Sequence, residues 1–301
     1  MSKLELGPIR CVVPAGDRCG EGALWSAGEN AVYWTDINRF LVHRYDCGDG
    51  RMATWLFDEP AVALSLTTKP GLILVALGSR LILWRPADDE RHDHGFALEA
   101  WPAVRLNDGR TDPRGSFWIG SMRNNVGPHG EVLPAGGADG VLVSIDGDGQ
   151  VSQWRDGLGV SNTLCWSPDR TRFYFADTTA NTIWEHAYDA ETGAIGAPRP
   201  FFSGFDRGWP DGSAIDAEGY LWNCRFGGGC IVRLGPDGAI DRVIDMPVTN
   251  ITTAAFGGPD LTTLFVTTAA AGAPESERLA GSLFAIDANV KGLPENRFIV
   301  R

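Results

Sequence analysis

The 301-residue chain contains no long apolar run and no recognisable export signal. Its most apolar stretch, GLILVALGSRLILW, is interrupted by Gly78, Ser79 and Arg80, whereas a membrane-spanning helix needs about 20 apolar residues in succession. The N-terminal segment MSKLELGPIRCVVPAGD carries Glu5 and Pro8 where a signal peptide needs an apolar core. We therefore expect a protein without membrane spans, located in the cytoplasm.

The chain also lacks an excess of positive charge and closely spaced cysteine pairs. Its formal net charge is -12, with 26 Lys and Arg residues against 38 Asp and Glu residues. Nucleic acids and anionic membranes attract basic surfaces, so neither is an expected partner. The six cysteines include no C-x-x-C pair, and in a chain without an export signal we expect buried thiols rather than disulfides.

Several catalytic motifs are missing as well. The five histidines form no H-E-x-x-H zinc motif, and no serine lies in a G-x-S-x-G elbow. The sequence has neither a phosphate-binding P-loop nor a G-x-G-x-x-G nucleotide fingerprint. These absences argue against serine-nucleophile chemistry of the α/β-hydrolase type and against nucleotide-dependent chemistry.

Short strands joined by tight turns are abundant in the sequence. Glycine (38), proline (18) and tryptophan (11) are frequent, and alternation of apolar and polar residues is commoner than helical periodicity. Six alternating segments each have a large apolar residue near the centre. These anchor residues are separated by 40, 44, 57, 47 and 43 positions: Trp34, Leu74, Trp118, Phe175, Trp222 and Phe265. Intervals of about 40–50 residues are typical of the four-stranded blades of a β-propeller.

The repeat predicts an all-β, six-bladed β-propeller with four antiparallel strands per blade. Further strand–turn–strand segments, such as GVLVSIDGDGQVSQW, follow the anchors and supply the outer strands. The long third interval contains MRNNVGPHGEVLPAGGADG, which we interpret as a loop insertion. Six units fill residues 1–301, so we expect a single domain. The alternative, an irregular β-sandwich, would not require the even spacing.

Polar residues ahead of four anchors are nearly in register. Glu21 and Asn162 each lie 13 residues before an anchor, and Asn107 and Asp211 each lie 11 before one. The inner strands of a propeller deliver their first residues to one mouth of the central channel. The offsets of 13 and 11 residues differ by two, and side chains alternate between the two faces of a strand, so all four side chains are expected on the same face. We therefore expect the four side chains to converge at similar height on the channel rim.

The converging residues suit a divalent cation. Glu21, Asn162 and Asp211 offer hard oxygen donors, two of them charged, and leave room for water or substrate. Two converging carboxylates without a positive ion would repel each other until one held a proton. Arg105 offers planar donors for a substrate oxygen. Taken singly, Asp211 in Pro-Asp-Gly and Asp108 in Asn-Asp-Gly could be ordinary turn residues, and the partner of a buried Asn162 could be a metal or a backbone network.

Five motifs carry a family resemblance. GEGALW, RLNDGRTDPRGSFWIGSM, GVSNTLCWSPD, FYFADT and PDGSAIDAEGYLWNCRFGGG occur in this order between about residue 17 and residue 285. They resemble the signature segments of the senescence marker protein/gluconolactonase/regucalcin family, and the chain looks most like its bacterial sugar-acid lactonases. The resemblance implies a six-bladed propeller with one divalent metal ion in the channel. It implies Glu21, Asn162 and Asp211 as the metal ligands.

The resemblance also implies a substrate pocket beside the metal. Family equivalents of Arg105 and Asn107 contact a sugar lactone, and Asp108 borders the pocket. Animal members carry an acidic pair after a GTM-like segment, which corresponds to GSMRNN in this chain, and use the second residue of the pair on substrate hydroxyls. Here the corresponding residue is the uncharged Asn125. The donor types leave Ca²⁺, Mn²⁺, Mg²⁺, Zn²⁺ and Fe²⁺ open as the ion.

The expected activity is metal-dependent hydrolysis of an aldonolactone to the open sugar acid. The substrate would be a pentono- or hexonolactone such as arabinono-, xylono-, galactono- or gluconolactone. Asp211 is the expected acceptor of the proton of the attacking water, and the protein is expected to be a monomer. An alternative is a metal-binding regulatory propeller without turnover. A third, hydrolysis of another ester, would favour histidine in the channel, and no histidine occupies a rim position.

Overall fold

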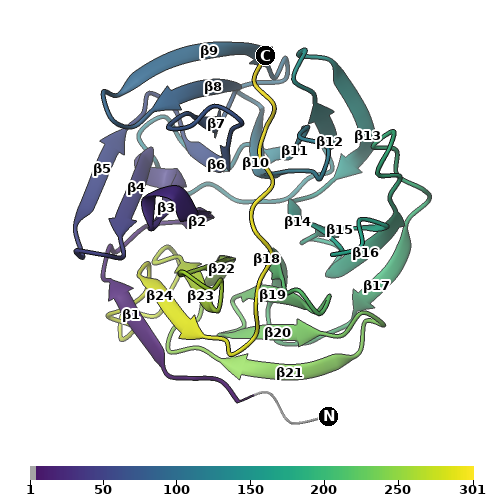
Figure 1. Cartoon of the computed structure of the whole chain (residues 1–301). Helices are drawn as coiled ribbons and strands as arrows, with labels where there is room; N and C mark the ends of the chain where they lie inside the picture. The colour runs from purple at the N-terminus through teal and green to yellow at the C-terminus, as the bar shows by residue number, and fades with distance from the viewer. Residues whose placement is uncertain (1–4) are drawn as a thin grey trace.

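The computed structural model describes residues 5–301, which form a ring of six four-stranded sheets (Figure 1). Hydrogen-bonded neighbours within each sheet are antiparallel. The first strand of each blade lies nearest the centre of the ring. The predicted six-bladed β-propeller, with four antiparallel strands per blade, is confirmed. We number the blades 1 to 6 along the chain.

Five blades are built from strands consecutive in the sequence, with the innermost strand first. Blade 1 contains β2 (Gly20–Ser26), η1 (Ala27–Glu29), β3 (Ala31–Asp36), η2 (Ile37–Arg39), β4 (Leu41–Asp46) and β5 (Met52–Leu56). Blades 2 and 3 contain β6 (Ala61–Leu66), β7 (Ile73–Leu77), β8 (Arg80–Arg85), β9 (Glu90–Ala97), β10 (Val104–Thr111), β11 (Phe117–Arg123), β12 (Gly140–Ile145) and β13 (Val151–Leu158). Blades 4 and 5 contain β14 (Ser161–Trp166), β15 (Arg172–Asp177), β16 (Thr182–Ala187), β17 (Arg199–Ser203), β18 (Trp209–Ile215), β19 (Leu221–Phe226), β20 (Cys230–Leu234) and β21 (Ile240–Asp245).

Blade 6 joins the two ends of the chain and closes the ring. It contains β22 (Ile251–Gly257), β23 (Thr263–Thr268) and β24 (Leu283–Asp287), and its outermost strand is the N-terminal β1 (Ile9–Val13). The register pairs Ile9 with Ile286. Strand pairing across the closure satisfies backbone groups that would otherwise be exposed at a sheet edge.

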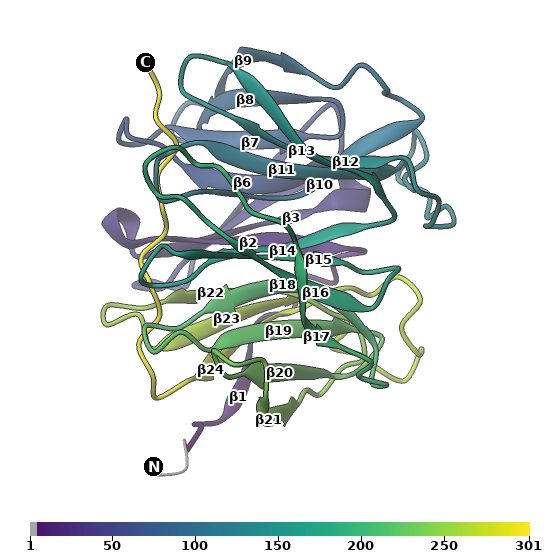
Figure 2. The same cartoon turned by 90° about the vertical axis from the view of Figure 1, so that its right-hand side faces the viewer.

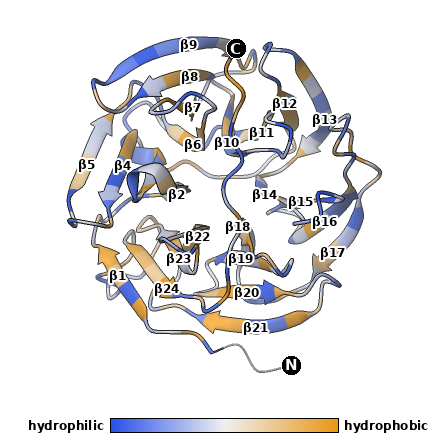
Figure 3. Ribbon diagram, in the orientation of Figure 1, coloured by the Kyte–Doolittle hydropathy of each residue, from blue (hydrophilic) through white to orange (hydrophobic). Residues whose placement is uncertain are grey.

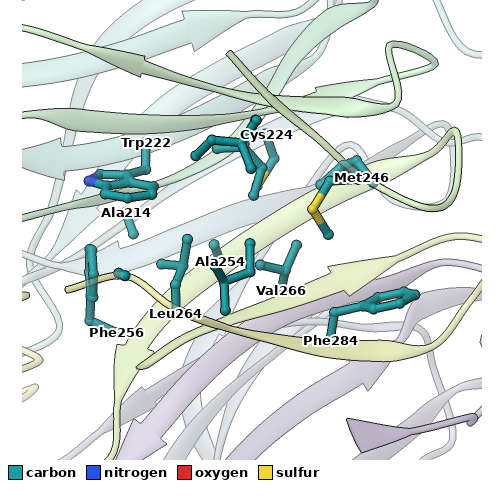
Figure 4. Packing of buried hydrophobic residues seen from close by; sticks show 14 of the residues in the cluster. Ala214, Trp222, Cys224, Met246, Ala254, Phe256, Leu264, Val266 and Phe284 are labelled. Atoms are coloured by element: carbon teal, nitrogen blue, oxygen red, sulfur yellow. The ribbon is translucent and has the colours of Figure 1, made fainter. Parts of the chain in front are cut away.

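The blades pack face to face through apolar side chains. Between blades 5 and 6, Trp222 lies edge-on to Phe256 with ring centroids 5.7 Å apart, and Val266 and Phe284 belong to the same cluster (Figure 4). Full burial of an aliphatic or phenyl side chain contributes about 1.5–3 kcal/mol. Strands at the rim face water instead, and β9 is hydrophilic along most of its length (Figure 3). The core therefore consists of the interfaces between blades.

Several anchor residues that revealed the repeat are fully buried and fixed by a polar contact. The indole of Trp118 donates to Asp112 (2.9 Å), and that of Trp222 donates to Asp216 (2.9 Å). Each aspartate lies in the turn between the first two strands of its blade. A buried indole N–H needs an acceptor, so this repeated pair fixes both the turn and the anchor.

A segment after β24 crosses the ring, a feature that was not predicted from the sequence. Residues 288–301, which we call the C-terminal strap, run over one face of the propeller (Figures 1 and 2). In blade 5, the N–H of Ala217 donates to Lys291 O (2.8 Å), and in blade 2 the carbonyl of Leu66 accepts from Phe298 N (2.8 Å). The strap therefore connects blades on different sides of the ring.

The C-terminal strap covers the channel mouth at the ends of the inner strands. A cavity of about 140 Å³ lies there, lined by Arg110 of β10, Cys165 of β14 and strap residues 293–296. Arg110 Nε lies 3.8 Å from Glu295 Oε2. Most of the candidate residues predicted from the sequence lie in the first half of an inner strand, and Asn125 follows β11, whose end pairs with the beginning of β10. We call that opposite mouth the open mouth.

Two expectations from composition can be compared with the structure. Within residues 5–301, no helix is long and apolar enough to cross a membrane. All six cysteines are free thiols, and Cys165, Cys224 and Cys230 are buried. The expected burial is found for these three, whereas Cys11, Cys19 and Cys47 are only partly buried.

Candidate active site

Every inner strand breaks its hydrogen-bond ladder, and the candidate residues lie at four of these breaks. In blades 1 and 4 the register shifts directly after Glu21 and Asn162. In blades 3 and 5, Asn107 and Asp211 are themselves the first unpaired residues. Such β-bulges bend a strand and redirect its side chains. Pairing resumes at Leu24 and Cys165, three residues after Glu21 and Asn162, and at Gly109 and Ser213, two residues after Asn107 and Asp211. The four candidates therefore lie within one residue of the same place in their blades.

The bulges of blades 1 and 4 share a backbone geometry that those of blades 3 and 5 lack. Glu21 and Asn162 are followed by residues in the left-handed region, Gly22 (φ 60°) and Thr163 (φ 54°). Glycine adopts this conformation readily, whereas a β-branched residue is strained there. The hydroxyl of Thr163 donates to the carbonyl of Asp211 in the next blade, a contact that favours the strained conformation.

Three carboxylates, those of Glu21, Asp211 and Asp108, are close enough in the channel to affect one another. Glu21 and Asp211 are each 8% exposed. Burial raises the pKa of Glu21 well above its usual range, and the charges of Asp211 and Asp108 raise it further. Burial and the charge of Asp108 likewise raise the pKa of Asp211. Such a site favours either retained protons or a bound cation.

Arg105 serves the site differently from what we expected. Its Nε and Nη2 both donate to Asn125 Oδ1 (2.9 and 2.7 Å), and Nη1 donates to Asn107 Oδ1 (2.7 Å) and Leu106 O (2.8 Å). These four bonds leave one of the five guanidinium N–H groups for a ligand. Burial lowers the pKa of Arg105 to about 10. Arg105 therefore holds Asn107 and Asn125 and does not present a free planar fork.

Asn107 and Asn162 are joined directly. Asn107 Nδ2 donates to Ser161 O (2.9 Å) and to Asn162 Oδ1 (3.2 Å), and Asn162 Nδ2 donates to the hydroxyl of Thr178 (2.8 Å). The sequence left open whether a metal or a backbone network would satisfy Asn162. The structure provides two side-chain partners, one of them Thr178, which sequence reasoning missed.

The backbone before and at Asp211 is also held in place. The carbonyl of Asp211 accepts from Thr163 and from Asn223 Nδ2 (3.2 Å), and the carbonyl of Pro210 accepts from the Thr178 hydroxyl (2.7 Å). No side chain within residues 5–301 donates a hydrogen bond to the Asp211 carboxylate. The backbone of Asp211 is therefore fixed while its carboxylate stays available for a ligand.

The remaining predicted residues lie around this centre. Asp108 is partly exposed, and burial raises its pKa while the charge of Arg110 and backbone N–H groups, including those of Thr163 and Leu164, lower it. Asn125 is the second residue of the loop insertion, residues 124–139, and is fixed by Arg105. The structure thus brings together all the residues predicted from the sequence.

The loop insertion reaches across to blade 1. The carbonyl of Gly130 accepts from Arg18 Nη1 (3.1 Å) and from Asn38 Nδ2 (3.1 Å). Arg18 immediately precedes Cys19, and Asn38 lies in η2 of blade 1, whose Ile37 N–H donates to Cys19 O (3.0 Å). The loop insertion therefore contacts the segment that leads to Glu21. The thiol of Cys19 has its pKa raised by burial and by the charges of Glu21 and Asp211. Cys19 therefore remains a protonated thiol beside the site.

Two features limit the chemistry available at the site. None of the five histidines lies on an inner strand: they are on β4, β9 and β16 and in the loop insertion. Within the described part of the chain, no group of three or more His, Cys, Asp or Glu side chains is placed to hold a metal ion. Any cation here would therefore need the amide oxygen of Asn162 in addition to carboxylates.

Comparisons with known proteins agree with this architecture. The chain is 35% identical to the pentonolactonase XacC of Haloferax volcanii, over 96% of this chain and 98% of that protein. It is 34% identical to the 6-deoxy-6-sulfogluconolactonase of Pseudomonas putida, over the same shares. A solved structure described as a calcium-binding protein, regucalcin, from Agrobacterium tumefaciens aligns with a TM-score of 0.89, 29% identity and 97% coverage of both chains.

These names agree with the expected class of enzyme, because lactonases are carboxylic ester hydrolases. The model of one family, described as SMP-30/Gluconolactonase/LRE-like region, matches residues 19–270. This range includes every candidate residue and the inner strands of all six blades. The chain therefore belongs to the SMP-30/gluconolactonase/LRE-like family.

Proposed function

We propose that this protein is a metal-dependent hydrolase that opens a sugar lactone, a pentono- or hexonolactone, to the sugar acid. The observation that carries the proposal is the convergence of buried Glu21, Asn162 and Asp211 beside Arg105 and Asn107 at the open mouth of the channel. The names of the lactonase relatives support the same class of reaction.

The residues present fit one divalent cation. Glu21 and Asp211 supply buried carboxylates whose pKa values are raised by burial and by neighbouring negative charge. A positive ion would remove this unfavourable clustering and keep both groups ionised. Asn162 would supply a neutral oxygen, and the all-oxygen set suits Ca²⁺, Mn²⁺ or Mg²⁺, with Zn²⁺ and Fe²⁺ also possible ions. When bound, the ion would act as a Lewis acid toward the lactone carbonyl.

The side chains of the site have separable roles in the reaction. Asp211 accepts the proton of the attacking water, because its carboxylate receives no side-chain hydrogen bond and its backbone is fixed. Asn107 and the free N–H of Arg105 orient the ring and hydroxyl oxygens of the substrate. Asn125, whose Oδ1 is occupied by Arg105, offers its amide N–H groups to the sugar, and Asp108 borders the same pocket.

The protein is proposed to act as a single domain spanning residues 1–301 and as a cytoplasmic monomer. Its partner is a small-molecule lactone, not a nucleic acid or a membrane, in keeping with the net charge of -12. The C-terminal strap closes the other mouth, so substrate would enter at the open mouth beside the loop insertion.

A second candidate function is a metal-binding regulatory propeller without turnover. The regucalcin name of the Agrobacterium structure favours it, since that protein is described as calcium-binding. Arg105, Asn107 and Asn125 argue for the lactonase, because a metal-storage site has no need of ordered sugar-binding donors beside the ion.

One experiment separates the two functions. Metal-stripped protein is given a panel of pentono- and hexonolactones, with Ca²⁺, Mn²⁺, Mg²⁺, Zn²⁺ or Fe²⁺ added back singly, and acid release is followed by pH-stat titration. Metal-dependent release above the spontaneous rate supports the lactonase and identifies the ion and the sugar. Tight metal binding with no release from any lactone favours the regulatory propeller.

A further inference from the structure

A one-way chain of hydrogen bonds runs through the candidate site from blade 3 to blade 5. Arg105 Nη1 donates to Asn107 Oδ1 (2.7 Å), and Asn107 Nδ2 donates to Asn162 Oδ1 (3.2 Å). Asn162 Nδ2 donates to Thr178 Oγ1 (2.8 Å), and Thr178 Oγ1 donates to Pro210 O (2.7 Å). The chain links Asn162 to the residue before Asp211 through the single hydroxyl of Thr178.

The two ends of this chain fix its direction. A guanidinium can only donate and a backbone carbonyl can only accept. The one proton of the Thr178 hydroxyl is used on Pro210, so its oxygen must accept from Asn162. The amide of Asn162 therefore directs its NH₂ toward Thr178 and its carbonyl oxygen toward Asn107. A flipped amide would lose the bond to Thr178 and bring its NH₂ against that of Asn107.

Thr178 also connects Asn162 to the segment that carries Asp211. It follows directly after β15, and its own N–H donates to Val160 O (2.9 Å), which places it beside the start of β14. Pro210 immediately precedes Asp211, whose carbonyl is held by Thr163 of the same blade 4. Two consecutive carbonyls of blade 5 thus accept hydroxyl bonds from blade 4.

We propose that Thr178 is a positioning residue for the cation site: its hydroxyl keeps the carbonyl oxygen of Asn162 directed into the channel and fixes its distance from Asp211. This inference rests on the metal site of the proposed function, and it concerns metal affinity rather than turnover. Outer-shell partners of metal ligands commonly affect affinity by about 10–100-fold.

The test uses the substitutions Thr178→Val and Thr178→Ser in the full-length protein. Valine has a similar shape but can neither accept from Asn162 nor donate to Pro210, whereas serine retains both bonds. Binding of Mn²⁺ to metal-stripped protein is measured by titration calorimetry. We expect Thr178→Val to weaken Mn²⁺ binding by about 10–100-fold and Thr178→Ser to restore affinity to within about threefold of the unaltered protein.

A matched control distinguishes positioning from a general loss of stability. Thr182 lies in the same hairpin, and its hydroxyl donates to Ala180 O (3.0 Å), away from the candidate ligands. Thr182→Val should lower the melting temperature of metal-free protein without changing Mn²⁺ affinity. Equal Mn²⁺ affinity in Thr178→Val and unaltered protein would overturn the proposal, as would equal weakening by Thr182→Val.

The outcomes also separate this proposal from the proposed function. If the unaltered protein binds Mn²⁺ but hydrolyses no lactone, the lactonase is wrong, while weaker binding in Thr178→Val still supports the role of Thr178. If unaltered protein takes up neither Mn²⁺ nor Ca²⁺, the metal site is wrong and the role of Thr178 is overturned with it.

Discussion

Asp211 in blade 5 and Thr252 in blade 6 occupy the same place in the fold, yet their side chains have different surroundings. Each is the first residue of a two-residue bulge in its inner strand, opposite Cys224 in one blade and Thr267 in the other. The hydroxyl of Thr252 bonds to Gly20 O (2.5 Å) and to the Thr267 hydroxyl (2.8 Å). No side chain within residues 5–301 donates to the Asp211 carboxylate.

The contrast shows how a repeated scaffold can divide structural and chemical roles among its blades. Buried polar groups are normally satisfied by the protein itself. Thr252 follows this rule and links blade 6 to blade 1. Asp211 departs from it, because its carboxylate is bonded by the backbone N–H of Gly212 but by no side-chain donor, and a buried charge so weakly compensated is unfavourable unless a ligand compensates it. A buried carboxylate without a side-chain donor is therefore the indicator of function in this comparison.

Removal of the Asp211 charge is expected to have the largest effect. Asp211→Asn keeps the size and shape of the side chain but supplies neither a proton acceptor nor a charged oxygen ligand. Lactone hydrolysis should fall by on the order of 10²–10⁴-fold, as measured by steady-state kinetics at saturating metal. Circular dichroism and the melting temperature should show a folded protein. Activity within tenfold of the unaltered protein would rule out Asp211 as the proton acceptor.

A smaller effect is expected on the pH dependence of stability. The pKa values of Glu21 and Asp211 are raised in the folded protein, whereas in the unfolded chain both groups titrate near pH 4. As pH rises above about 4, the unfolded state loses these protons first, so the free energy of unfolding decreases until the folded-state pKa values are passed. Metal-stripped protein should therefore melt at lower temperature at pH 8 than at pH 5.

Calorimetry of one variant and of the unaltered protein tests whether Glu21 and Asp211 cause this pH dependence. Asp211→Asn removes one titrating group and one repulsive charge, so its melting temperature without metal should fall less between pH 5 and pH 8. Mn²⁺ at about 100 times its dissociation constant should stabilise the unaltered protein by about 2.7 kcal/mol. Identical pH slopes in both proteins would show that these carboxylates do not control the stability of the metal-free state.

The sequence predicted the fold because the signal is repeated. The large anchors, Trp118 and Trp222 among them, recur at blade spacing, and both proved to be fully buried. Counting back from the anchors also identified Asp211 and Asn107, because their bulges lie at the same offset from the turn. The bulges themselves were not predicted, since Thr163 adopts a positive φ that its residue type disfavours.

What the sequence did not predict depends on contacts between blades. Nothing local distinguishes Thr178, which bridges Asn162 and Pro210, from its neighbour Thr179, whose hydroxyl bonds to Asp177 (2.7 Å). The hydrogen bonds of Arg105 could not be predicted either. Two of the four go to Asn125 and depend on the path of the loop insertion, and the other two go to Leu106 and Asn107 of its own strand. The C-terminal strap has no strand-like alternation, and its position follows from pairing with residues more than 200 positions earlier, such as Leu66.

The smallest effect on turnover is expected at the blade 6 counterpart. Thr252→Val removes the hydroxyl that bonds to Gly20 O and Thr267, and it leaves buried polar groups without a partner. The free energy of unfolding should fall by about 1–3 kcal/mol, as measured by urea denaturation. The kcat of lactone hydrolysis should stay within about threefold of the unaltered protein, because no predicted ligand is lost. A fall in kcat comparable to that of Asp211→Asn would mean that the bulge of blade 6 belongs to the reacting centre, and the division between structural and chemical blades would then be wrong.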